Sequence, residues 1–169
     1  SQPLQLVRSL AVLVRIRKRR LMEFARRHPH GWREAYQLLM QFSLLIQGSP
    51  TASQSPFSAY EFASAALAQG HSIQRAFFYQ DAVLIGNKLV ATPQDEFDIQ
   101  SAWQALGKAH QIPLVLCVAS CLRRGILDDR EAERFEKSAT SIAETFEIGG
   151  LGQLIDASLE SARLITFRP

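Results

Sequence analysis

Apolar and polar positions form alternating blocks from residue 42 onward, and these blocks predict strands and helices in turn. Short apolar runs bounded by Gly, Pro or polar residues predict strands at 42–47, 73–79, 112–117, 145–148 and 163–167. Segments with helical spacing predict helices at 56–69, 95–106, 128–135 and 151–161 and a short helical turn at 81–86. In the first helix, Tyr60, Ala63 and Leu67 share one stripe, and Asp95-Glu96 is expected to cap the second. Strands that alternate with helices predict a parallel, doubly wound α/β sheet.

Three predicted strand ends bring candidate chemistry to one edge of this sheet. Ligands of such sheets bind outside the carboxyl ends of the strands, where we expect the loop from Gly48, the turn at Tyr79 and Cys117 to lie. The loop at 48–55 is rich in Gly, Ser, Pro and Thr, but it lacks the Gly-Lys-Ser/Thr ending and the three-glycine spacing of nucleotide-binding loops. We therefore expect Gly48 to shape a pocket wall rather than to bind phosphate.

Cys117 is the principal candidate for chemistry. It ends an apolar run and precedes a short helical turn that Gly125 stops. Free backbone N–H groups and the helix dipole at such a junction favour the thiolate, the reactive form of cysteine. The alternative is a structural thiol, because free Cys is among the most buried residue types. Arg123 and Arg124, within two helical turns, are either a solvated pair or electropositive support for a thiolate or an acidic partner.

The other sulfur and imidazole groups offer little chemistry. Two Cys residues do not make a disulfide framework, and Cys117 and Cys121, four residues apart, can bond only with suitable local geometry. No zinc-ligand pattern is visible, and we interpret His28 and His30 as solvated. No metal or organic cofactor is expected, and a reducing cytoplasm is the expected location.

Charge divides the 169-residue chain into two parts. The net charge is +3, but residues 1–39 carry nine Lys or Arg and two Glu, a net +7, which leaves −4 for residues 40–169. The basic pI of about 9.1 therefore does not indicate that the globular part binds nucleic acid. Residues 4–39 are predicted to be helical, with a break at Pro29 and Gly31. The apolar stretch at 10–14 is too short to span a bilayer.

Three interpretations of this basic segment are open: a transit-like leader, a segment that lies on an anionic surface, and an added extension ahead of a start at Met40. The abrupt charge change near Met40 favours the extension. We thus expect a basic N-terminal extension over residues 1–39, helical or disordered, and one compact domain over residues 40–169.

Five groups of segments, in order, resemble the TusD/DsrE family of sulfurtransferase subunits. They are MQFSLLIQGSP at 40–50, FFY at 77–79, DEFD at 95–98 with AW at 102–103, CVA at 117–119 followed by RRG at 123–125, and GLG at 150–152. The resemblance runs from Met40 to Phe167 and implies a flavodoxin-like α/β fold. It also implies that one Cys carries sulfur as a persulfide, and Cys117 falls on that position.

The resemblance further implies partners. They are TusB- and TusC-like subunits in a heterohexamer, a TusA-like sulfur donor and a TusE-like acceptor, in a relay for 2-thiolation of the tRNA wobble uridine. In that relay tRNA is an indirect partner, and no direct membrane contact is expected. The alternatives are a DsrE-type role in sulfur oxidation, a non-catalytic scaffold, and a thiol redox sensor that uses Cys117 and Cys121. Cys121 departs from the family pattern, where a small apolar residue is expected, and either resolves a persulfide or packs.

Overall fold

A parallel five-stranded sheet organises the chain in the computed structural model, which describes residues 39–169. The helix expected over residues 4–39 lies outside this described part except for its last residue. The sheet order is β4-β3-β2-β1-β5, and every neighbouring pair is parallel. The strands are β1 (Gln41–Ile46), β2 (Ser72–Phe78), β3 (Leu114–Cys117), β4 (Phe146–Gly149) and β5 (Arg163–Phe167). The chain adds β1 to β4 in one direction and then returns to place β5 on the other side of β1, which confirms the doubly wound α/β class.

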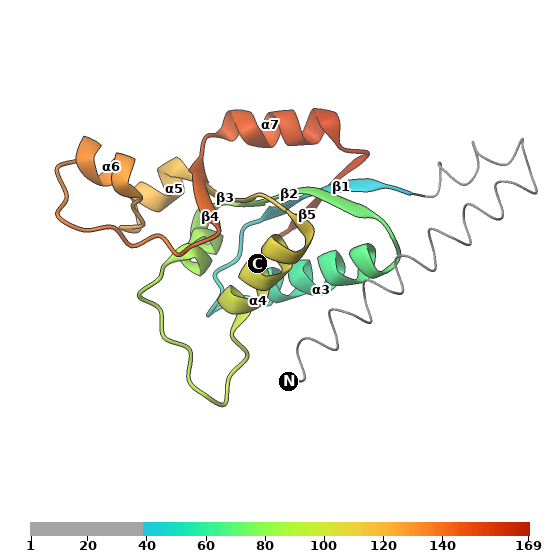
Figure 1. Ribbon diagram of the computed structural model, residues 1–169, viewed down its shortest axis with the longest axis horizontal. Helices are drawn as coiled ribbons and strands as arrows, with labels where there is room; N and C mark the ends of the chain where they lie inside the picture. Colours follow the sequence, from blue (N-terminus) through green and yellow to red (C-terminus); the bar gives the residue numbers. More distant parts are fainter. Residues whose placement is uncertain (1–38) are drawn as a thin grey trace, which may run out of the picture. The chain divides into compact units, whose positions relative to one another are not determined.

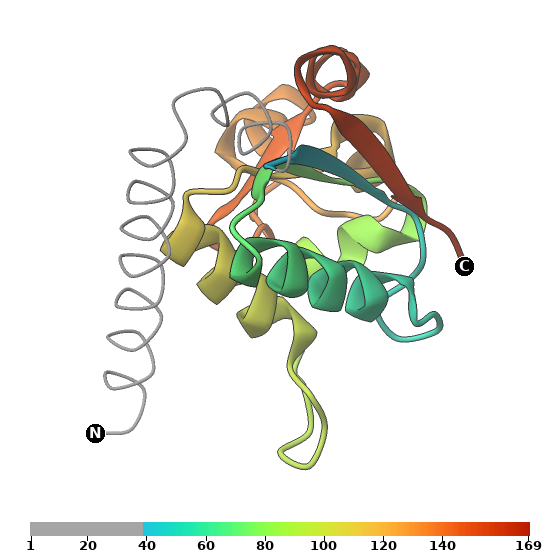
Figure 2. The same ribbon diagram turned by 90° about the vertical axis from the view of Figure 1, so that its right-hand side faces the viewer.

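Helices cover both faces of the sheet. Figures 1 and 2 show α3 and α4 against one face and α7 against the other, while α5 and α6 lie beyond the ends of β3 and β4. These elements are α3 (Ser55–Ala68), the 3-10 helix η1 (Gln80–Gly86), α4 (Ile99–His110), α5 (Val118–Leu122), α6 (Asp129–Arg134) and α7 (Leu151–Glu160). Because both faces are covered, the inner strand β3 is apolar and buried at every position, as its unbroken apolar run in the sequence indicated.

Trp103 is the centre of the core between the sheet and the helices α3 and α4. Its side chain is fully buried, and its ring lies 5.4 Å from that of Phe78 and 5.9 Å from that of Tyr60, both edge to face. The indole Nε1 donates a hydrogen bond to the carbonyl oxygen of Pro56 at 3.2 Å. One side chain therefore ties β2, α3 and α4 together, which fixes the frame that holds the strand ends.

The prediction that Asp95-Glu96 caps α4 is wrong. The helix begins at Ile99, and Asp98 caps it: the Ser101 backbone N–H and hydroxyl donate to the Asp98 carboxylate at 3.0 Å and 2.6 Å. These hydrogen bonds hold the pKa of Asp98 below its ordinary value. Asp95 and Glu96 lie in the exposed loop before the helix. A cap side chain must reach N–H groups at the start of the helix, and only Asp98 is placed to do so.

The buried face of α3 also differs from the stripe expected at Tyr60, Ala63 and Leu67. Its fully or nearly fully buried apolar positions include Ala59, Ala63 and Ala66, whereas Tyr60 and Leu67 are only partly buried. Small side chains let a helix backbone approach the sheet closely, and the larger residues then lie at the flanks of the contact.

Candidate functional site

The carboxyl ends of four neighbouring strands meet at one edge of the sheet. The register pairs Ile46 with Phe78, Phe78 with Leu116, and Cys117 with Gly149, so these ends are nearly level. The loop with Gly48 follows β1, the turn at Tyr79 follows β2, and Cys117 ends β3. The three segments therefore share the edge at which parallel α/β sheets bind ligands, as expected from the sequence.

Cys117 is both the last residue of β3 and the N-cap of α5. Its thiol is free of any disulfide, and the residue is only 1% exposed. The helix that follows has five residues, so the dipole contribution expected from the sequence is small. In this arrangement Cys117 is closed to solvent, and a reaction with another protein requires the covering residues to move.

Cys121 lies one helical turn further on and is completely buried. Burial raises the pKa of its thiol from the ordinary 9.0 to about 12, the nearby Cys117 adds to the rise, and Arg124 opposes it. Cys121 is therefore a neutral thiol at physiological pH. A resolving cysteine must supply a thiolate, so the geometry favours the packing role of Cys121 over the resolving role.

The raised pKa of Cys121 predicts a loss of stability at alkaline pH. Above about pH 9 the unfolded chain releases the Cys121 proton while the folded chain retains it, so stability falls by up to ~1.4 kcal/mol per pH unit until about pH 12. We expect the free energy of unfolding to drop between pH 8 and 10 by about 1 kcal/mol more in the native sequence than in a Cys121→Ala variant. Urea unfolding at the two pH values measures this. Equal drops in both proteins would show that Cys121 ionises as readily folded as unfolded.

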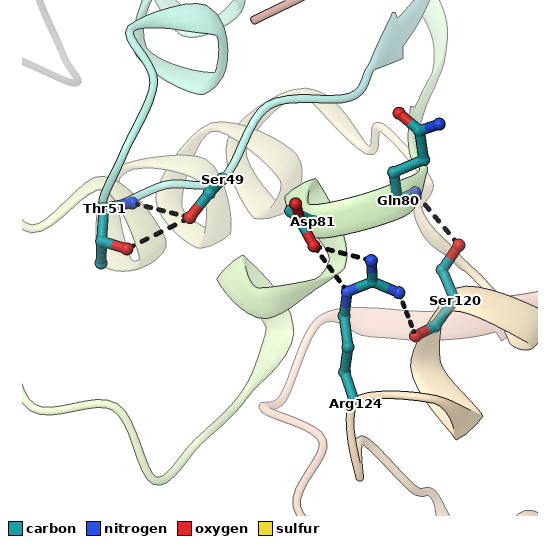
Figure 3. A network of polar contacts seen from close by, with 6 residues as sticks. All are labelled: Ser49, Thr51, Gln80, Asp81, Ser120 and Arg124. Carbon is teal, nitrogen blue, oxygen red and sulfur yellow. Dashed lines mark hydrogen bonds and ion pairs between the residues drawn. The ribbon is translucent and has the colours of Figure 1, made fainter.

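The two arginines expected near the site have separate environments. Arg124 donates from Nε and Nη2 to the Asp81 Oδ1 atom at 2.8 Å and 2.6 Å, and from Nη1 to the Ser120 carbonyl oxygen at 3.1 Å (Figure 3). Arg123 is exposed at the C-terminal end of α5 and makes no ion pair within residues 39–169, so it remains solvated. The interpretation as a solvated pair therefore fails for Arg124, whose charge is matched by Asp81.

Gly48 and Tyr79 support the edge through their backbones. The Gly48 N–H donates to Ser55 Oγ at 2.9 Å, and a Cβ at this position would overlap the side chains of Ser53 and Ser55. The Tyr79 N–H donates to the Ile46 carbonyl oxygen at 2.8 Å. Further along the same loop, a short network joins Ser49 and Thr51 (Figure 3). The role of Gly48 as a pocket wall stays a prediction.

Sequence reasoning missed three residues of the edge. The Gln80 N–H donates to Ser120 Oγ at 3.0 Å, and Asp81 holds Arg124 (Figure 3). Gln80 has a φ of 55°, a left-handed backbone that non-glycine residues adopt rarely. Asp81 stands at the start of a helical turn after a strand, which was only a weak sign of a role at this edge. Its partner Arg124 is 43 residues away and could not be inferred from the local sequence pattern.

Within residues 39–169, no group of three or more His, Cys, Asp or Glu side chains is arranged to hold a metal ion. No helix of the described part is both long enough and apolar enough to cross a membrane.

The fold and the position of Cys117 together define the class of protein: an α/β domain with a cysteine at the carboxyl end of a strand of its parallel sheet. The chain belongs to the DsrE/DsrF-like family, whose family model matches residues 40–167.

Several relatives align with 128 residues of this chain, which is 76% of it, and the alignments include nearly the whole length of each relative. They include the DsrE protein of Allochromatium vinosum at 44% identity over 98% of that protein. A sulfurtransferase TusD homolog of Vibrio parahaemolyticus is 43% identical over 98% of its length, and the sulfurtransferase TusD of Erwinia tasmaniensis is 42% identical over 100% of its length. The crystal structure of the ychN protein from E. coli, at 24% identity, superposes with a TM-score of 0.61 over 76% of this chain and 100% of that chain, which confirms the fold.

Proposed function

We propose that this chain is a sulfurtransferase that carries sulfur as a persulfide on Cys117. The observation that carries the proposal is the place of Cys117 at the carboxyl end of β3, on the ligand-binding edge of the sheet. Relatives named sulfurtransferases, 42% and 43% identical to this chain, support the class of reaction. The high pKa of Cys121 supports Cys117 as the reacting thiol of the two.

The chemistry needs only thiol exchange. A donor persulfide presents its outer sulfur, and the Cys117 thiolate attacks that atom. A new S–S bond forms at Cys117 while the S–S bond of the donor breaks, and the donor leaves as a thiolate. An acceptor thiolate then takes the outer sulfur in the same way and returns Cys117 to its thiolate. Each step exchanges one S–S bond for another, so no external oxidant or reductant is consumed.

Mass spectrometry after treatment with a protein persulfide donor separates this function from its alternatives. We expect the Cys117 peptide to gain about 32 Da, the mass of one sulfur atom. A chain that gains no sulfur would be a non-catalytic scaffold. A chain that loses two hydrogens to a bond between Cys117 and Cys121 would be a redox sensor. Either of these outcomes contradicts the proposal.

The finer assignment is a place in a relay of the TusA to TusD to TusE kind, which serves tRNA 2-thiolation in the cytoplasm. The relatives named TusD support it. A DsrE-type role in sulfur oxidation is the second candidate, and the DsrE protein at 44% identity favours it. The rate of sulfur transfer from Cys117 to a purified acceptor of each pathway decides between the two candidates. Faster transfer to a TusE-like acceptor supports tRNA 2-thiolation, and faster transfer to an acceptor from sulfur oxidation supports the DsrE-type role.

Association with TusB- and TusC-like subunits is part of the same proposal. The surface of α7 supports it, because Leu151, Ile155 and Leu159 are 50%, 59% and 79% exposed at helical spacing. Exposed apolar stripes of this kind mark protein interfaces. Sedimentation of the co-expressed subunits tests the heterohexamer, and a monomeric chain in that mixture would contradict it.

We also propose that residues 1–39 are an extension outside the sulfurtransferase domain. The match of the family model to residues 40–167 supports this division. Sulfur loading of a chain that starts at Met40 tests this proposal. We expect the shortened chain to load as much sulfur as the full chain, and a loss of loading would contradict the proposal.

A further inference from the structure

Three hydrogen bonds join the turn after β2 to the segment after β3: Gln80 N–H donates to Ser120 Oγ, and Arg124 donates twice to Asp81 (Figure 3). A fourth bond, from Arg124 Nη1 to the Ser120 carbonyl oxygen, lies within the second segment, and we call these four residues the clip. We infer that Asp81 and Arg124 are positioning residues that hold α5 in place and thereby keep Cys117 closed to solvent. The inference rests on the proposed function only for the identity of Cys117 as the sulfur carrier.

The helix that carries Cys117 at its start cannot hold its own position. α5 has five residues, and a helix of that length is not stable by itself. Two bonds of the clip converge on Ser120, three residues after Cys117: its hydroxyl accepts from Gln80 N–H, and its carbonyl oxygen accepts from Arg124 Nη1. The place of the first turn of α5 therefore depends on the tertiary contact from Gln80, whereas the backbone of Cys117 is held at the end of β3 by the sheet.

The turn on the other side of the clip is strained. Gln80 holds a left-handed φ of 55°, which costs free energy for a residue with a Cβ. Such a conformation persists when surrounding contacts impose it, and the hydrogen bond from Gln80 N–H to Ser120 is one such contact. If the clip opens, the turn can relax to an ordinary backbone, so the strain favours opening.

The ionic part of the clip is partly exposed, whereas the thiol is buried. The side chains of Arg124 and Asp81 are 25% and 58% exposed, whereas Cys117 is 1% exposed. An exposed ion pair is weak and is screened by salt. It can therefore break without disturbing the buried sheet, and its loss lowers the cost of displacing α5, whose Cys121 lies next to Cys117. A bound partner that supplies its own charge to Arg124 or Asp81 would have the same effect.

The rate at which iodoacetamide alkylates Cys117 tests this inference. In a Cys121→Ala background, Cys117 is the single thiol of the chain. We expect Asp81→Asn to raise the alkylation rate about fivefold, the gain for losing one exposed charge-assisted contact. Salt should raise the rate of the background protein toward that of the variant and should barely change the variant, because the reagent is uncharged and the screened pair is already gone.

Glu144→Gln is the matched control, since it removes the same kind of carboxylate from another exposed ion pair, with Lys108 at 3.9 Å. Its alkylation rate and salt response should equal those of the background protein. An unchanged rate in Asp81→Asn, or an equal rise in Glu144→Gln, would overturn the inference. Alkylation uses no sulfur donor, so a protein that fails to carry sulfur but shows the expected rates contradicts the proposed function and not the clip.

Discussion

Replacement of Cys117 by Ser is expected to abolish sulfur loading and transfer. A serine hydroxyl keeps the size and place of the thiol, but it does not form a thiolate and has no sulfur to bind the outer sulfur of a persulfide. Because Cys117 is buried without a disulfide, the exchange should leave the fold nearly unchanged. Circular dichroism checks the fold, and the mass of the protein after treatment with a persulfide donor checks loading. We expect no detectable sulfur on the variant.

Cys121→Ala is the matched control for this experiment, since it removes the other free thiol, four residues away. Its raised pKa keeps Cys121 protonated, so the variant should load sulfur at a rate close to that of the native sequence. If sulfur loading survives in Cys117→Ser and disappears in Cys121→Ala, Cys121 carries the sulfur. The assignment of the sulfur to Cys117 would then be wrong.

Trp103→Ala is expected to cause the largest loss of stability. The side chain is fully buried between α3, β2 and the rest of α4, and its removal leaves a cavity and deletes the hydrogen bond to the Pro56 carbonyl oxygen. Truncation of a buried Trp costs about 3–5 kcal/mol. Urea unfolding should show a lower midpoint with a free energy of unfolding reduced by about that amount.

An exposed apolar residue provides the comparison. Leu89 is 74% exposed in the loop before α4, and Leu89→Ala should change the free energy of unfolding by less than about 0.5 kcal/mol. A loss below about 1 kcal/mol for Trp103→Ala would mean that Trp103 is not the centre of the core.

The sheet and its ligand edge could be predicted because their signals are local. Each apolar run between Gly, Pro or polar residues corresponds to a strand, and the run at 163–167 has the bounds of β5. Asp128 was expected to start a helix, and it caps α6 by accepting a hydrogen bond from Glu131 N–H at 2.8 Å. Once strands and helices alternate, the carboxyl ends of the strands must share an edge, and so Gly48, Tyr79 and Cys117 were expected together.

The features that could not be predicted depend on contacts between distant parts of the chain. The choice of Asp98 over Asp95 as a cap depends on where the loop turns toward α4. The Gln80 to Ser120 and Asp81 to Arg124 bonds span 40 and 43 residues, and no periodicity encodes such pairs. The nearly complete burial of Cys117 likewise follows from tertiary packing, since strand-end position left both an available thiolate and a buried structural thiol open.

The most direct test of the central claim follows labelled sulfur through a single turnover. A donor persulfide with radiolabelled outer sulfur is mixed with the protein and then with an acceptor thiol protein, and samples are quenched over time. We expect label to accumulate first on Cys117 and then to leave it at the rate at which it appears on the acceptor. Label that reaches the acceptor while Cys117 stays unlabelled would contradict the account.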